Sequence, residues 1–335
     1  MRGASTADHG RSRDPAYRFP ASSLATDHLR EAPSVCPLPS SPGEAAPAPL
    51  RVLACVADSP HAGVIVSEAA AIARTLSAEL ELLHVAPAAE ATQARLQAIL
   101  RDHGLEPGAY PLAVRDGRPA HVIRAQARQG LIDLIVMGAN EREGLLDSLM
   151  MGSIARRVAL TAPCSVLLLS QGQAPARTGF REVVVATRLD DYSRQMLALI
   201  SRTARQVGTQ TLHVVRELSV LELRALEYDI GSPRELEQHQ RRLLFEMNEA
   251  LLNFIEPIDF GELKLRVHCL EAGEGVGAMD YARGHGADLL VYPAPPRPLS
   301  LLHRFFDNRR SVVLQQIPCA LLFYRPSPHR PRVAP

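Results

Sequence analysis

The chain contains one long pattern twice, and this internal repeat restricts its fold more than any other feature of the sequence. The first copy, residues 133–168, begins with DLIVM and ends with APCSVLL, and the second, residues 288–323, begins with DLLVY and ends with IPCALLF. Both copies have the same length, so they align without a gap. A supersecondary unit that recurs at this distance indicates tandem domains of one fold, and the 335 residues suffice for two domains of ordinary size.

Short apolar runs alternate with helix-like segments throughout the first half of the chain. The runs are too short for helices and rich in β-forming residues, and they predict strands at residues 51–56, 79–85, 110–115, 134–137 and 166–169. Apolar residues at helical spacing predict four helices between them. This alternation favours a parallel sheet covered by helices, so the expected fold class is α/β with two tandem doubly wound parallel-sheet domains.

The same alternation restarts after a linker rich in Gly, Pro and Ala. The triplet 212–214 repeats the sequence Leu-His-Val of residues 83–85, so we expect His84 and His213 to occupy equivalent strand ends in a core or rim role. Residues 218–255 predict a pair of helices that is broken near residue 231. The predicted organisation is a disordered tail at 1–49, a first domain at 50–171, a linker at 172–180, a second domain at 181–326 and a frayed tail at 327–335.

Composition and charge exclude several classes of protein. A net charge of +1 and an aromatic content of 4% without Trp argue against nucleic acid as a partner. No apolar run is long enough for a membrane span, and the amino-terminal residues do not form a secretory signal. The five cysteines form no CxxC pair, and those beside apolar strands are typical of small core residues in a reducing compartment. We therefore expect a cytoplasmic protein.

The stretch after the fourth predicted strand has the arrangement of an anion-binding site. The strand ends at Gly138, a polar loop follows, and Gly152 and Ser153 precede a helix with an apolar face. In open α/β sheets, anions and nucleotides bind where the carboxyl end of a strand faces a helix N-terminus. Glycines let the backbone take positive φ and approach a phosphate, to which Ser153 can donate a hydrogen bond. The alternative is that the glycines only turn a loop and Ser153 only caps a helix.

These residues resemble the universal stress protein family, and the resemblance extends over about residues 50–325. The nucleotide signature of that family is Gly-x2-Gly-x9-Gly-Ser/Thr, located between strand 4 and the last helix. Gly138 matches the first glycine, Gly152 and Ser153 match the last pair, and Gly144 matches a common further glycine of the loop. Glu141 replaces the second glycine, and the loop after it is one residue longer than in the family. A carboxylate at this position would repel a phosphate unless its side chain points away.

The resemblance implies that the first domain binds ATP or another adenine nucleotide. It places Asp58 and Val85 near the base and ribose, and the glycines and Ser153 around the phosphates. The family has an aspartate at the end of strand 1, where this chain has Ala57 followed by Asp58. The predicted nucleotide-binding residues are Asp58, Ser59, Val85, Met137, Gly138, Gly144, Gly152, Ser153 and Ile154.

In the second copy, the residues aligned with the signature do not suit a phosphate. Pro293, Leu299, Asp307 and Asn308 occupy these positions. Proline has no N–H group to donate, and the carboxylate of Asp307 would repel an anion. We therefore predict that only the first domain binds a nucleotide.

The family also suggests how the two domains associate, because the last strands of two such domains commonly pair around a two-fold axis. We expect residues 165–169 and 320–324 to pair in this way within one chain. The sequence contains no HExxH, GxSxG or P-loop motif and no identifiable general base or metal carboxylate, so we expect neither a metal nor an enzyme.

The leading hypothesis is an intracellular regulatory protein of the universal stress type, in which an adenine nucleotide acts as a signal. The alternative is an interaction scaffold without a ligand, and a weak ATPase is a third hypothesis. The sequence does not identify a protein partner.

Overall fold

The structure is a computed structural model. It describes residues 49–59, 61–87, 90–104, 106, 108–139, 152–170, 179–218, 233–273, 277–294 and 317–330. Residues 1–48 of the predicted amino-terminal tail lie outside these residues, as do Glu141 and Gly144 of the first-domain loop and Leu299, Asp307 and Asn308 of the second.

The first half alternates strands and helices as predicted, and its strands lie within two residues of the expected bounds. Its elements are β1 (Arg51–Cys55), α1 (Ala62–Thr75), β2 (Glu79–Val85), α2 (Glu90–Asp102), β3 (Leu112–Arg115), α3 (Pro119–Gln129), β4 (Leu134–Gly138), α4 (Ser153–Thr161) and β5 (Ser165–Leu169). Pro119 begins α3, where its missing N–H is not needed. Pro163 follows the end of α4 and prevents its continuation.

The second half repeats this alternation with a longer middle. Its elements are β6 (Glu182–Thr187), α5 (Asp191–Gln206), β7 (Thr211–Leu218), α7 (Pro233–Ile255), β8 (Lys264–Gly273), α8 (Gly277–Gly284), β9 (Leu289–Pro293) and β10 (Ala320–Tyr324). The carboxylate of Asp190 caps α5 by accepting a hydrogen bond of 2.7 Å from the N–H of Ser193. Of the predicted helix pair, α7 is the second member, and the first lies outside the described residues.

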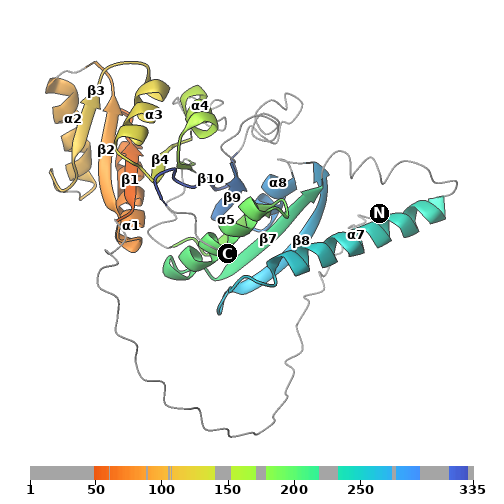
Figure 1. Ribbon diagram of the computed structural model, residues 1–335. Helices are drawn as coiled ribbons and strands as arrows, with labels where there is room; N and C mark the ends of the chain where they lie inside the picture. Colours follow the sequence, from red (N-terminus) through yellow and green to blue (C-terminus); the bar gives the residue numbers. More distant parts are fainter. Residues whose placement is uncertain are drawn as a thin grey trace, which may run out of the picture. The chain divides into compact units, whose positions relative to one another are not determined.

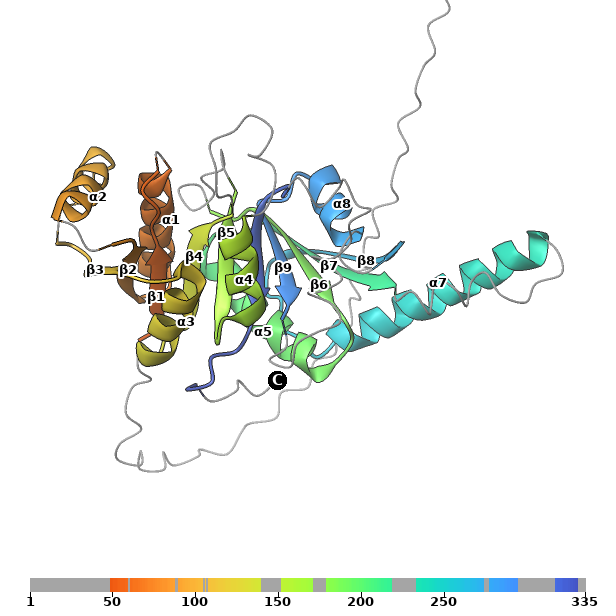
Figure 2. The ribbon, with the colours of Figure 1, turned by 90° about the horizontal axis from the view of Figure 1, so that it is seen from above.

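All these strands belong to one ten-stranded sheet with the order β3-β2-β1-β4-β5-β10-β9-β6-β7-β8 (Figure 1). The strand labels follow the same order in Figure 2. Every pair of neighbours is parallel except β5 and β10, which run antiparallel, with Leu167 opposite Leu322. The predicted pairing of the two last strands is confirmed, and it relates the halves by a pseudo-two-fold axis.

Alternate strand residues point to opposite faces of the sheet, and each face has its own apolar core. Helices α1, α2, α5 and α7 pack on one face, whereas α3, α4 and α8 pack on the other. The strands are therefore covered on both sides, which explains their nearly continuous apolar sequences. Among the described residues, no helix is both long and apolar enough to cross a membrane.

The strand registers contradict the expected equivalence of His84 and His213. Val52 of β1 lies opposite Leu80, and the matching residue of β6, Val183, lies opposite Leu212. Leu212 thus corresponds to Leu80 rather than to Leu83. His84 lies near the carboxyl end of β2 and His213 near the amino end of β7. The recurring triplet misled the alignment because the sequence does not reveal the register of a strand against its neighbours.

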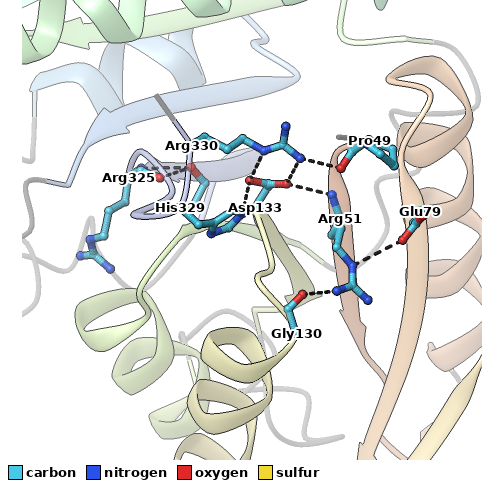
Figure 3. Close-up of polar contacts among 9 residues, drawn as sticks. Pro49, Arg51, Glu79, Gly130, Asp133, Arg325, His329 and Arg330 are labelled. Carbon is cyan, nitrogen blue, oxygen red and sulfur yellow. Dashed lines mark hydrogen bonds and ion pairs between the residues drawn. The ribbon is translucent and has the colours of Figure 1, made fainter. Parts of the chain in front are cut away.

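The carboxyl-terminal residues differ from the expected frayed tail up to Arg330. Because β10 runs antiparallel to β5, it ends beside the amino ends of β1 and β4, and the residues after it reach Asp133 (Figure 3). Arg330 donates two hydrogen bonds to the Asp133 carboxylate, 2.7 Å from Nε and 2.8 Å from Nη2. Nε2 of His329 lies 3.1 Å from the same carboxylate. Residues 327–330 therefore act as a strap that joins the end of the second half to the first, and we call them the C-terminal strap.

Candidate functional site

The carboxyl ends of β1, β2 and β4 lie side by side in the first half, and the start of α4 is held next to them. The N–H of Gly152 donates a hydrogen bond of 2.8 Å to the carbonyl of Ala139, the residue directly after β4. The carbonyl of Gly152 accepts the first helical bond, 3.0 Å from the N–H of Arg156. This hydrogen bond thus holds a helix N-terminus, with its partial positive charge, at the carboxyl ends of the strands.

The two described signature glycines do not adopt the conformation that we expected of them. Gly152 is the N-cap of α4 with φ −64° and ψ 153°, which is extended backbone open to any residue. Gly138 has no positive φ either, and a Cβ built on it would lie 3.7 Å from Cδ1 of Ile65, an ordinary contact. Conformational freedom is therefore not the reason for glycine at these positions. Close approach of a ligand to the backbone is the remaining functional reason.

Asp58 and Ser59 form the turn between β1 and α1, beside the end of β4. The Asp58 carboxylate is exposed and lies 2.6 Å from Nη1 of Arg95 on α2. Solvent-exposed ion pairs contribute about 0–1 kcal/mol, so a ligand can compete for either partner at small cost. Ser59 donates its N–H to Ala57 and accepts a bond from Ala62, which sets the tight entry into α1.

Three other predicted residues belong to the apolar core on the α3–α4 face. Met137 is buried there, and Val85 and Ile154 are half-buried against it. Ser153 is the exposed first residue of α4, and Gly144 lies outside the described residues.

His84 holds the end of β1 in place. Its Nδ1 donates a hydrogen bond of 2.7 Å to the carbonyl of Val56, and the residue is 5% exposed. The N–H of Val56 donates to Leu83 at 2.9 Å, so β2 fixes both backbone groups two residues before Asp58. His84 thus has a structural role at the rim of the site, as its position in an apolar strand indicated.

In the second half, side chains occupy the corresponding position at the carboxyl ends of the strands. Ala294 follows β9 as Ala139 follows β4, but its carbonyl lies 3.0 Å from the hydroxyl of Tyr192 and 3.1 Å from Nε of Arg325. The same hydroxyl lies 2.8 Å from the carbonyl of Tyr324. Burial raises the pKa of Tyr192, so its hydroxyl stays protonated.

Sequence reasoning missed Tyr192. The loop prolines pointed to a degenerate site, but no motif links a residue at the start of α5 to the end of β9.

The described residues offer little chemistry of other kinds. Burial raises the pKa of the Cys164 and Cys319 thiols to about 12, so neither is a thiolate nucleophile at neutral pH. No group of three His, Cys, Asp or Glu side chains in the described part of the chain could hold a metal ion. The helix N-terminus held at the end of β4 suits an anionic ligand.

Comparison with known proteins relates the first half of the chain to a protein family. The model of the Universal stress protein family matches residues 50–170. A search of the curated proteins gave no match to the chain.

Solved structures resemble the chain over both halves. A functionally unknown protein from Pseudomonas aeruginosa PAO1 is 18% identical with a TM-score of 0.58, over 84% of this chain and 94% of that one. A putative universal stress protein from Pseudomonas aeruginosa UCBPP-PA14 gives the same values. A universal stress protein from Archaeoglobus fulgidus DSM 4304 is 12% identical with a TM-score of 0.51, over 84% and 97%. At these identities the likeness establishes the fold of both halves.

Proposed function

Since residues 50–170 form a domain of the universal stress protein family, we propose that the chain is a stress-type regulatory protein whose first domain binds ATP or another adenine nucleotide. The observation that carries this proposal is the hydrogen bond from Gly152 to Ala139, which holds the start of α4 at the carboxyl end of β4. Gly138, Gly152 and Ser153 surround this point in the order of the family signature. A helix N-terminus at a strand end suits a phosphate.

The exposed Asp58 supports the proposed position of the base and ribose of the nucleotide. It lies on the neighbouring strand end, and its partner Arg95 is exposed as well. A carboxylate there can accept a hydrogen bond from an amino or hydroxyl group, as the base and ribose of an adenine nucleotide provide. The predicted residues would thus contact both ends of one ligand.

We propose that the nucleotide acts as a signal rather than a substrate. The polar groups that the described part of the chain brings to this edge suit recognition, and the buried thiols are not ionised. The free cysteines at 55, 164, 269 and 319 agree with a reducing, cytoplasmic location, which we include in the proposal.

The second candidate is a scaffold without a ligand. It is favoured by Glu141 in the signature loop and by Tyr192, which occupies the second sheet edge. In this case the antiparallel seam of β5 and β10 would serve only to present two fused domains to a partner.

Calorimetric titration with ATP separates these candidates, and position 152 offers a matched pair of variants. Asn and Asp have the same shape, and both are good N-cap residues, so Gly152→Asn and Gly152→Asp alter α4 in the same way. Only Asp adds a negative charge at the phosphate position.

We expect the wild type to bind ATP and Gly152→Asp to bind at least about tenfold more weakly than Gly152→Asn. Equal affinities of the two variants would contradict the phosphate placement. If the wild type did not bind ATP at millimolar concentration, the scaffold without a ligand would remain as the candidate function. Phosphate release above that of a Ser153→Ala variant would instead indicate an ATPase.

A further inference from the structure

A cavity of about 570 Å³ lies on the α1–α5 face of the sheet, at the seam between the two halves. Its floor comes from six strands, and the contributions of the two halves match in register. The floor residues are Val52, Leu134 and Leu167 from the first half and Val183, Leu289 and Leu322 from the second. This volume is within the range of small-molecule sites.

The cavity is separate from the candidate nucleotide site. Its first-half residues, such as Leu134 and Ser165, lie at the amino ends of β4 and β5, whereas the nucleotide site lies at the carboxyl ends. Ile72 of α1 and Leu76, directly after its end, form one wall. Leu199 of α5 and Val207, directly after its end, contribute to the other wall. The wall and floor side chains are mostly apolar, so the transfer of an apolar molecule from water into the cavity is favourable.

The charged residues of the cavity are predominantly basic. Among the described residues, Arg202, Arg325 and Arg330 line it together with a single carboxylate, that of Asp133. Arg330 and Asp133 neutralise each other, and Figure 3 shows the hydrogen bonds between them.

The other two arginines lack an anionic partner in the part of the chain that the structure describes. Arg325 is 6% exposed, and its guanidinium donates to the carbonyls of Ala162 and Ala294, which carry no charge. Arg202 is exposed on α5, and its side chain forms no ion pair with a described residue. The surroundings of the cavity are therefore positive, which favours an anion.

We propose that this cavity binds a fatty acid, with its carboxylate next to Arg202 and its alkyl chain on Leu167 and Leu322. A straight alkyl chain follows the apolar floor between α1 and α5. The carboxylate stays at the exposed cation instead of entering the apolar interior, where an unpaired charge would be costly. The inference is independent of the nucleotide proposal, because no residue is shared by the two sites.

Titration of the full chain with decanoate tests the inference, and decan-1-ol serves as the neutral analogue. We expect saturable decanoate binding. Arg202→Glu should weaken it about tenfold and leave decan-1-ol binding unchanged, because only the acid carries a charge. Arg188→Glu is the control, since Arg188 is exposed on the same half and does not line the cavity.

Two filling variants test the position of the alkyl chain. Leu199→Trp and Gln195→Trp enlarge half-buried side chains that line the cavity, and each should reduce the affinity for both ligands more than tenfold. Circular dichroism confirms that a variant is folded, and two positions are used in case one is not.

The inference would be overturned if the wild type did not bind decanoate, or if folded filling variants bound it normally. It would also be overturned if a filling variant changed the oligomeric state on size-exclusion chromatography while decanoate did not bind, since a second copy would then be the occupant.

Discussion

Replacing Arg330 with alanine should lower the free energy of unfolding by about 2 kcal/mol. Arg330 makes two charge-assisted hydrogen bonds to Asp133, whose side chain is 8% exposed, whereas that of Arg330 is 26% exposed. Hydrogen bonds to charged groups contribute about 1.5–3 kcal/mol, and exposed ion pairs about 0–1 kcal/mol. Since the ion pair is neither fully buried nor fully exposed, we expect a loss of stability between those of an exposed ion pair and of a buried charged hydrogen bond.

The loss should stay below the ~3–5 kcal/mol that follows when a buried charge is left alone. Without Arg330, the Asp133 carboxylate still accepts a hydrogen bond of 2.9 Å from the N–H of Arg51 and still lies near His329. The matched control is Arg188→Ala, which removes an exposed arginine and should change stability by less than about 0.5 kcal/mol.

Urea denaturation followed by circular dichroism at neutral pH measures both effects. A double-mutant cycle with Asp133→Asn should give a coupling energy of about 1–2 kcal/mol, because both single variants remove the same ion pair. If Arg330→Ala were as stable as the control, the C-terminal strap would not hold the two halves together.

The pH dependence provides an independent check. Burial alone would raise the pKa of Asp133, but hydrogen bonds from Arg330, Arg51 and Ser327 outweigh it and hold the pKa below its usual range. The native carboxylate therefore binds a proton less readily than the unfolded one, whose pKa is about 3.9. The stability from the ion pair is present above that pH and is lost as the pH falls through the native pKa. The difference between wild type and Arg330→Ala should shrink accordingly in acid.

Three further outcomes follow from buried groups. Tyr192→Phe leaves the carbonyls of Ala294 and Tyr324 without the hydroxyl and should lower stability by about 1–2 kcal/mol in urea denaturation, while an unchanged stability would contradict its role. Burial lowers the pKa of His213 despite its contact with Glu182, so stability should fall as the pH drops below about 6.5, and His213→Gln should flatten that slope. A thiol reagent should leave Cys164 and Cys319 unmodified in the native chain, and rapid labelling by mass spectrometry would refute their burial.

Most of the fold could be predicted from the sequence because it depends on local signals. Apolar runs, prolines and glycines marked the strands and helices, and the repeat indicated two like domains. The pairing of β5 with β10 was foreseen only through the resemblance to a family, since nothing in the residues of two distant strands states that they are neighbours. Local patterns thus predict the helices and strands, whereas the pairing of one strand with another requires further information.

Apart from the conformation of Gly138 and Gly152, the failures concern contacts between distant segments. The triplet at His84 and His213 suggested an equivalence that the strand registers do not support. Tyr192 and Arg330 make their main contacts more than a hundred positions away, with Ala294 and Asp133. No periodicity or motif carries such information, because each contact depends on where the sheet brings two strand ends together.

The repeat itself shows why likeness between the halves does not extend to a ligand. The aspartate shared by DLIVM and DLLVY has the same structural task in both, since Asp133 accepts a hydrogen bond from the N–H of Arg51 and Asp288 accepts one from Glu182. Both bonds join neighbouring strands at the amino edge of the sheet. The residues that differ, such as Gly152 and Tyr192, lie at the carboxyl edge, where a ligand would bind. The shared motif therefore supports the fold in both halves, and only the carboxyl edges can decide which half binds a nucleotide.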